Sequence, residues 1–105
     1  MSTIFVQPVE RAEQLLPLVR AAVNGEIVRL KLALGLARER LLPFERKYGV
    51  TSEHFIEHLT AEDLDGSDDE YVQWAGEYHL MQRLEEKLVH MQEVEYSDTA
   101  VLQRV

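Results

Sequence analysis

The chain has 105 residues, enough for one domain, and it contains no cysteine, which excludes disulfide bonds and thiolate-ligated metals. Its 11 basic and 19 acidic residues give a formal net charge of −8, and such a surface repels nucleic-acid phosphates and attracts basic partners. No stretch approaches the ~20 apolar residues of a membrane span, and no secretory signal opens the sequence. We therefore expect a cytoplasmic protein that binds neither membranes nor nucleic acid.

The charge is unevenly divided along the chain. Residues 1–50 carry eight Lys or Arg and five Asp or Glu, a net charge of +3, whereas residues 51–105 carry three and fourteen, a net charge of −11. The acidic second half can serve solubility alone, or it can bind a basic protein. Both interpretations remain open on charge alone.

The first predicted elements are an N-terminal segment and a long helix. Residues 1–8 form an ordered arm or a short edge strand, because β-branched and aromatic residues precede Pro8. The helix is predicted over residues 9–48. Pro17 and Pro43 should kink or divide it, since proline lacks the backbone N–H. Gly49 should end it, because glycine readily adopts the left-handed conformation found at helix ends.

Apolar residues recur along this first helix with the three- and four-residue spacing of a buried seam. The seam, which we expect to bind a second copy of the chain, comprises Val23, Ile27, Leu30, Leu34, Ala37 and Leu41. Further apolar or small residues, including Ala21, Val28 and Gly35, flank it. A helix that is apolar around most of its circumference is buried on more than one side, so we expect the first helix to be central.

A corner and a return helix follow. A short helix is predicted over residues 52–59, capped by Thr51 or Ser52, and an acidic turn around Asp65 and Gly66 comes next. The sequence from Ser67 to Glu70 is a capping box, which begins a long amphipathic helix over residues 68–95. Residues 96–105 are predicted to be a loose tail.

Together these elements predict an all-α fold in a single domain, residues 1–105. The two long helices form a hairpin with the short helix at its corner. A hairpin of unequal helices leaves an apolar stripe uncovered. We therefore expect two copies to associate as a dimeric antiparallel helical bundle, since most oligomers are symmetric dimers.

Three motifs invite a chemical interpretation. His54, Glu57 and His58 follow the H-x-x-E-H spacing of inverted zinc proteases, but a five-residue match lacks a third ligand and a substrate cleft. The acidic turn before Gly66 fails the calcium-loop pattern at its first and last ligand positions. Arg83 and His90, seven residues apart, resemble the Arg–His pair of HEPN ribonucleases. The residue after Arg83 is Leu84, where that family usually has a polar residue, so a solvent-exposed lattice of charges is the preferred explanation of the pair.

A longer match involves the segment from Pro43 to Phe55, the acidic turn and Trp74. This region resembles a group of small uncharacterised prokaryotic proteins with the pattern F-E-x-K-Y-G-x-x-S-x-x-F, then acidic residues, a tryptophan and a final helix. The resemblance covers residues 41–88 and implies an antitoxin encoded beside a small toxin. It implies no catalytic residue. The matching positions imply architecture, namely a helix stop, a corner and the residues that pack it: Glu45, Lys47, Tyr48, Gly49, Phe55 and Trp74. Trp74 is expected to pack at one end of the bundle against Phe44, Tyr48 or Phe55.

We therefore expect a non-enzymatic interaction protein, without metal or cofactor, that forms a homodimer and covers a basic protein such as a toxin. The acidic last helix would supply charge complementarity and its apolar residues affinity. The residues predicted to carry this contact are Trp74, Met81, Leu84, Leu88, Met91, Glu85, Glu86 and Glu93. The alternatives are a homo-oligomeric scaffold and, less economically, a HEPN-like ribonuclease or metal-dependent hydrolase.

Overall fold

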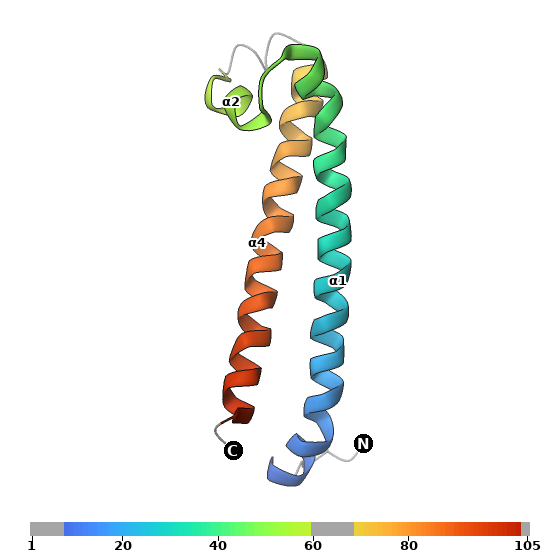
Figure 1. Ribbon diagram of the computed structural model, residues 1–105, viewed down its shortest axis with the longest axis vertical. Helices are drawn as coiled ribbons and strands as arrows, with labels where there is room; N and C mark the ends of the chain where they lie inside the picture. Colours follow the sequence, from blue (N-terminus) through green and yellow to red (C-terminus); the bar gives the residue numbers. More distant parts are fainter. Residues whose placement is uncertain (1–7, 60–68, 104–105) are drawn as a thin grey trace, which may run out of the picture.

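The computed structural model describes residues 8–59 and 69–103, and these residues form three helices. Helix α1 spans Pro8–Tyr48, α2 spans Ser52–Glu57 and α4 spans Asp69–Gln103 (Figure 1). No strand occurs within those two ranges, so the prediction of an all-helical protein is confirmed. The predicted N-terminal arm or strand lies outside the described residues. Among the helices described, none has the length and apolar character that crossing a membrane requires.

The two long helices lie side by side and run in opposite directions, with α2 beside the end where α1 stops and α4 begins (Figure 1). The molecule is elongated, with principal extents of 60 × 34 × 19 Å. Its radius of gyration is 20.7 Å, whereas a compact domain of about 100 residues has a radius near 13 Å. Because the molecule is so narrow, each long helix has one face on its neighbour and a wide face in solvent.

Neither proline divides α1. Pro17 and Pro43 both lie inside one continuous helix of 41 residues. The N-terminal end of α1, drawn in blue, bends away from the axis of the rest (Figure 1). Pro17 supplies a cause for this bend, because its ring displaces the carbonyl four residues earlier and removes one hydrogen bond.

The end of α1 follows the expected glycine stop. Gly49 has a φ of 68°, in the left-handed region, and its N–H donates to the carbonyl of Glu45 at 2.8 Å. Thr51 then caps α2, since its side-chain oxygen accepts a hydrogen bond from the N–H of His54 at 3.1 Å. Helix α2 ends at Glu57, so the predicted end at residue 59 is two residues too long.

Helix α4 is described from Asp69, whereas the predicted start at residue 68 and Ser67 of the capping box lie outside the described residues. Its other end differs from expectation. The helix continues to Gln103, so the prediction of a loose tail over residues 96–105 is wrong for the part described. The physical reason is that residues 96–103 contain neither glycine nor proline, so no residue there breaks the pattern of helical hydrogen bonds.

The core lies along the contact between α1 and α4. It contains every predicted seam residue of α1 from Ile27 onward, and each is at most 6% exposed: Ile27, Leu30, Leu34, Ala37 and Leu41. Val23 is only half-buried. The five residues from Ile27 to Leu41 are buried within a single chain, so they belong to its core and not to a dimer seam as predicted. A three-and-four spacing shows that a helix face is buried, but not whether the covering helix belongs to the same molecule.

Candidate functional site

An aromatic cluster fills the end of the molecule where all three helices meet. The indole of Trp74 is fully buried and stacks on the ring of Phe55, with centroids 3.8 Å apart and planes 4° apart. Phe44 and Tyr48 of α1 stack on the same indole at 5.6 Å and 5.3 Å. The predicted packing of Trp74 against these rings is confirmed. Its side chain is fully buried, so it offers no exposed surface for the contact with a partner that was also predicted. The cluster joins the helices to one another.

A short chain of hydrogen bonds holds α2 in this cluster. The indole N–H of Trp74 donates to the hydroxyl oxygen of Ser52 at 2.8 Å. That hydroxyl and the backbone N–H of Ser52 both donate to the Glu45 carboxylate, each at 2.8 Å. Ser52 is only 2% exposed, and its polar side chain is satisfied on both sides. Sequence reasoning missed this bonding role, although Glu45, Ser52 and Trp74 all belong to the pattern that carried the resemblance.

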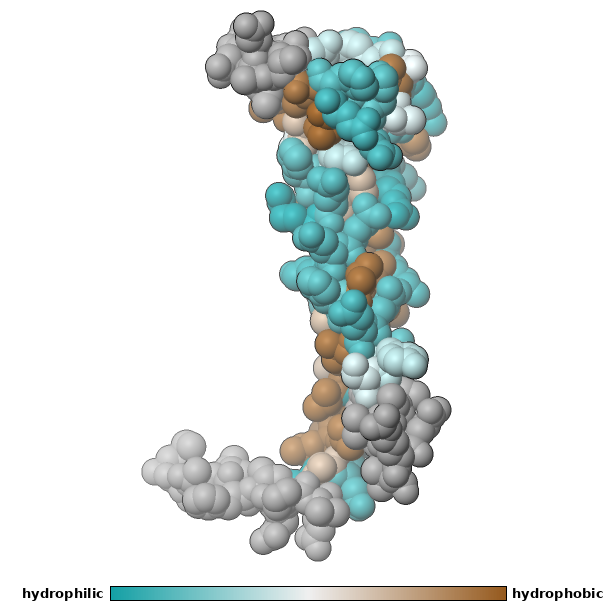
Figure 2. Space-filling model, turned by 90° about the vertical axis from the view of Figure 1, so that its left-hand side faces the viewer, coloured by the Kyte–Doolittle hydropathy of each residue, from teal (hydrophilic) through white to brown (hydrophobic). Residues whose placement is uncertain are grey.

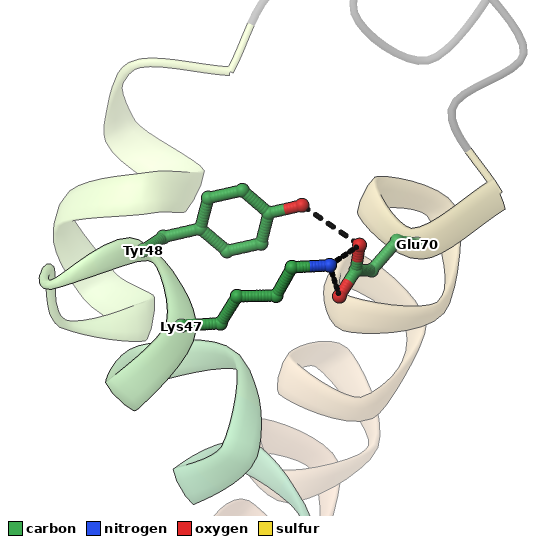
Figure 3. Close-up of polar contacts among 3 residues, drawn as sticks. All are labelled: Lys47, Tyr48 and Glu70. Carbon is green, nitrogen blue, oxygen red and sulfur yellow. Dashed lines mark hydrogen bonds and ion pairs between the residues drawn. The ribbon is translucent and has the colours of Figure 1, made fainter.

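A second polar contact joins the end of α1 to the start of α4 (Figure 3). Lys47 Nζ binds both carboxylate oxygens of Glu70, at 3.0 Å and 2.7 Å, and the Tyr48 hydroxyl donates to Oε2 at 2.8 Å. The hydrogen bonds from Lys47 and Tyr48 lower the pKa of Glu70 below its ordinary value of 4.5. The contact therefore stabilises the folded chain above pH 4.5. This contribution is lost as the pH falls through the lowered pKa of Glu70.

Tyr78 gives the molecule a dependence on alkaline pH. Burial raises the pKa of its phenol above 10.0, and the carboxylates of Glu53 and Glu85 add to the rise. The contribution of Tyr78 to the free energy of unfolding is fully present below pH 10, the ordinary pKa of a tyrosine. It is lost as the pH rises through the higher pKa of the folded state.

The Tyr78→Phe variant cannot ionise, so it should lose less stability between neutral and alkaline pH than the wild-type chain. Urea unfolding at pH 8 and pH 11 measures it, and Tyr96→Phe, at an exposed site, is the matched control. An equal effect of both variants would contradict the assignment.

The histidine pair does not form a recognisable metal centre. The rings of His54 and His58 stack with centroids 4.1 Å apart, and His58 Nδ1 lies 2.9 Å from the carbonyl oxygen of His54, with its role set by the tautomer. Glu57 ends a helix of six residues and is exposed. Throughout residues 8–59 and 69–103, no three histidine or carboxylate side chains gather closely enough to hold one metal ion.

Arg83 and His90 lie two turns apart on α4, and both are exposed. They line a shallow surface hollow whose walls come from α4 alone, including His79, Glu86 and Val89. No other element of the described chain faces them across this hollow. The ribonuclease alternative therefore stays a prediction.

Part of the uneven charge is paired within the molecule. Three cations of α1 pair with three carboxylates of α4: Arg38 with Glu85 at 3.3 Å, Arg40 with Glu77 at 2.8 Å, and Lys47 with Glu70 at 2.7 Å. Each pair is at least partly exposed and contributes little to stability, typically below about 1 kcal/mol. Together they orient α4 on α1. They also engage Glu85, one of the acidic groups predicted to contact a partner.

The remaining predicted contact residues of α4 divide into two sets. The apolar members are half-buried along the helix rather than displayed on an open face: Met81, Leu84, Leu88 and Met91. Met81 packs against the aromatic cluster. The acidic members Glu86 and Glu93 are exposed. The outer face of α4 is thus mainly polar, which agrees with the hydrophilic surface over the middle of the molecule in Figure 2.

The outer face of α1, opposite the core, is different. Leu18, Val28 and Leu32 are 65% or 66% exposed, and Leu36 is 48% exposed. The space above Gly35 is open, since a Cβ added there would meet no atom within 4 Å. These flanking positions are left uncovered by the single chain, as are further apolar residues of both long helices, including Val19 and Val89.

Comparisons with models of protein families, with curated proteins and with solved structures found no match for this chain. The resemblance to antitoxin-like proteins therefore stays a prediction. The described part of the chain has three features that bear on function: an aromatic cluster where the helices meet, a mainly polar outer face on α4 and an apolar outer face on α1.

Proposed function

We propose that this protein is a non-enzymatic interaction module, a helical hairpin that acts by binding other protein chains. The observation that carries the proposal is the exposed row of large apolar side chains on the outer face of α1, centred on Val28 and Leu32. Contiguous exposed apolar surface in a small protein marks a binding surface, because water contact with it is unfavourable.

The total exposed area supports the same conclusion. The chain exposes 8106 Å², whereas a compact monomer of 12.2 kDa is expected to expose about 6,100 Å². The excess of about 2,000 Å² is larger than the ~800 Å² that each partner contributes to a standard interface. The excess follows from the elongated shape of the chain, and it is large enough to include an interface of standard size.

A basic protein, such as a toxin, is the proposed partner for the outer face of α4. The exposed carboxylates of Glu86 and Glu93 would provide the charge complementarity, and the resemblance to antitoxin-like proteins supports this class of partner. The contact should weaken with salt, because exposed charges are screened. The α1–α4 ion pairs reduce the number of carboxylates that a basic partner can bind, since Glu70, Glu77 and Glu85 are already paired with cations of α1.

The test is affinity capture from the native host with three forms of the chain. The wild-type chain should retain a basic protein, and Glu86→Lys combined with Glu93→Lys should lose it. Val28→Glu should retain it, because Val28 lies on the other long helix. Retention of nothing except the chain itself would contradict a basic partner and would leave a homo-oligomeric scaffold as the function. That second candidate is favoured by the internal neutralisation of the α4 carboxylates.

A further inference from the structure

The outer face of α1 has a regular spacing of its own. Its central positions alternate in steps of three and four residues, as in a coiled-coil seam. We call this set the outer row: Leu18, Ala21, Gly25, Val28, Leu32 and Gly35. Leu32 stands two positions after the core residue Leu30, which places it about 200° around the helix from the core. The outer row and the core therefore occupy opposite sides of α1.

The outer row is self-complementary. An antiparallel copy of α1, related by a two-fold axis between Glu26 and Ile27, sets every large residue of the row against a small one. Leu32 faces Ala21 of the second copy, Val28 faces Gly25, and Leu18 faces Gly35. A large side chain opposite a small one lets two helices approach closely without leaving a cavity. A Cβ at Gly25 would meet only its own helix's Arg29 guanidinium, at 3.6 Å, so the single chain offers no packing reason for this glycine.

Charge does not oppose this arrangement. In the antiparallel register Arg29 lies near Ala22 of the second copy, and Lys31 lies near Asn24, because the two-fold axis pairs residues on the same flank. In a parallel pair each residue of the outer row would instead face its own counterpart, so leucine would meet leucine and glycine would meet glycine, and the fit of large against small side chains would be lost. The guanidinium of Arg29 also binds Glu26 of its own helix at 2.9 Å, which balances its charge before any association. The row therefore fits another copy of itself in one direction.

We propose that the partner of the outer row is a second copy of this chain, packed antiparallel along α1 about a two-fold axis between Glu26 and Ile27. The inference rests on the proposed function, since it names one partner of the interaction module. The two α1 helices would lie at the centre of the dimer and the two α4 helices on its outside. The acidic outer faces of α4, with Glu86 and Glu93, would stay free for a different protein.

Sedimentation equilibrium tests the dimer. The wild-type chain should sediment at twice its mass of 12.2 kDa as its concentration rises. Val28→Glu should weaken the dimer at least about tenfold, because it would bury an uncompensated carboxylate. The matched control is Val89→Glu on the exposed face of α4, where the dissociation constant should change less than about twofold. Circular dichroism should show the wild-type helix content for both variants, which checks that they are folded. Equal weakening by both variants would overturn the choice of face.

Disulfide trapping tests the direction, and the absence of native cysteine removes any background. Ala21→Cys chains mixed with Leu32→Cys chains should cross-link, whereas neither variant should cross-link alone. In the antiparallel dimer two Ala21 positions lie about 16 Å apart along the helix axes, beyond the ~7 Å that a disulfide can bridge. Cross-linking of Ala21→Cys by itself would overturn the antiparallel packing. Glu93→Cys, mixed with either variant, is the matched control and should not cross-link.

The two proposals fail in different ways. A wild-type chain that stays monomeric at the highest concentration overturns the dimer. If that monomer still retains another protein, the interaction function stands and only its partner is wrong. If the monomer retains no protein at all, both proposals fail.

Discussion

Replacing Trp74 with alanine should lower the free energy of unfolding by about 3–5 kcal/mol, the largest effect expected from one substitution in this chain. The indole is fully buried and stacks on rings from α1 and α2, so its removal opens a cavity at the point where all three helices meet. It also removes the hydrogen bond to Ser52. Because α2 has only six residues, it depends on this contact to stay in place. Chemical unfolding followed by circular dichroism measures the loss.

Two further substitutions separate packing from hydrogen bonding at this site. Trp74→Phe keeps an aromatic ring against Phe55 and removes only the N–H donor and part of the volume, so its cost should be about 1–2 kcal/mol. Val72→Ala, at a residue that is 48% exposed on the same helix, should change stability by less than about 0.5 kcal/mol. A cost for Trp74→Ala no larger than that of Val72→Ala would show that the aromatic cluster is not the main core of the molecule.

The second large effect distinguishes the two apolar faces of α1. Leu34→Ala should cost about 3 kcal/mol, because Leu34 is 5% exposed and packs in the contact with α4. Leu32→Ala removes the same atoms two residues away, from a side chain that is 66% exposed. In dilute solution, where the chain is a single copy, it should cost less than about 0.5 kcal/mol. Thermal and urea unfolding at matched low concentration measure both.

Concentration provides the control for this pair. The cost of Leu34→Ala should not depend on protein concentration, since its covering helix belongs to the same chain. The cost of Leu32→Ala should grow with concentration if the outer row binds a second copy, because association stabilises only a folded chain that can dimerise. A concentration-dependent cost for Leu34→Ala, with none for Leu32→Ala, would restore the predicted seam as the dimer contact and contradict the structure.

Local signals predicted most of the helical boundaries. Gly49 ends α1 in the left-handed conformation that glycine tolerates, and Thr51 caps α2 through its hydroxyl, both as the sequence indicates. Such features depend on a few neighbouring residues, so they can be recognised without the rest of the molecule. The ends without a strong signal were misjudged. Helix α4 continues past Glu95 because nothing in the following residues stops it.

Roles that depend on distant residues were not predictable in the same way. Trp74 was expected both to pack in the core and to contact a partner, because a tryptophan on an amphipathic helix fits either role. Its burial required Phe55 and Phe44 to arrive from two other helices. The Glu45–Ser52 hydrogen bonds likewise became visible only when the end of α1 and the start of α2 were placed together.

The helical class, the two long amphipathic segments and the corner between them could be predicted from the sequence, because helical periodicity and caps are local properties of the chain. The two apolar faces of α1 could be predicted in the same way. Which of these faces α4 covers became clear only from the packing of the two helices. Ile27, Leu30 and Leu34 are covered, while Val28 and Leu32 are left open. The physical reason is that burial depends on which helix arrives and how it is held, and the Arg40–Glu77 and Lys47–Glu70 contacts help to hold it.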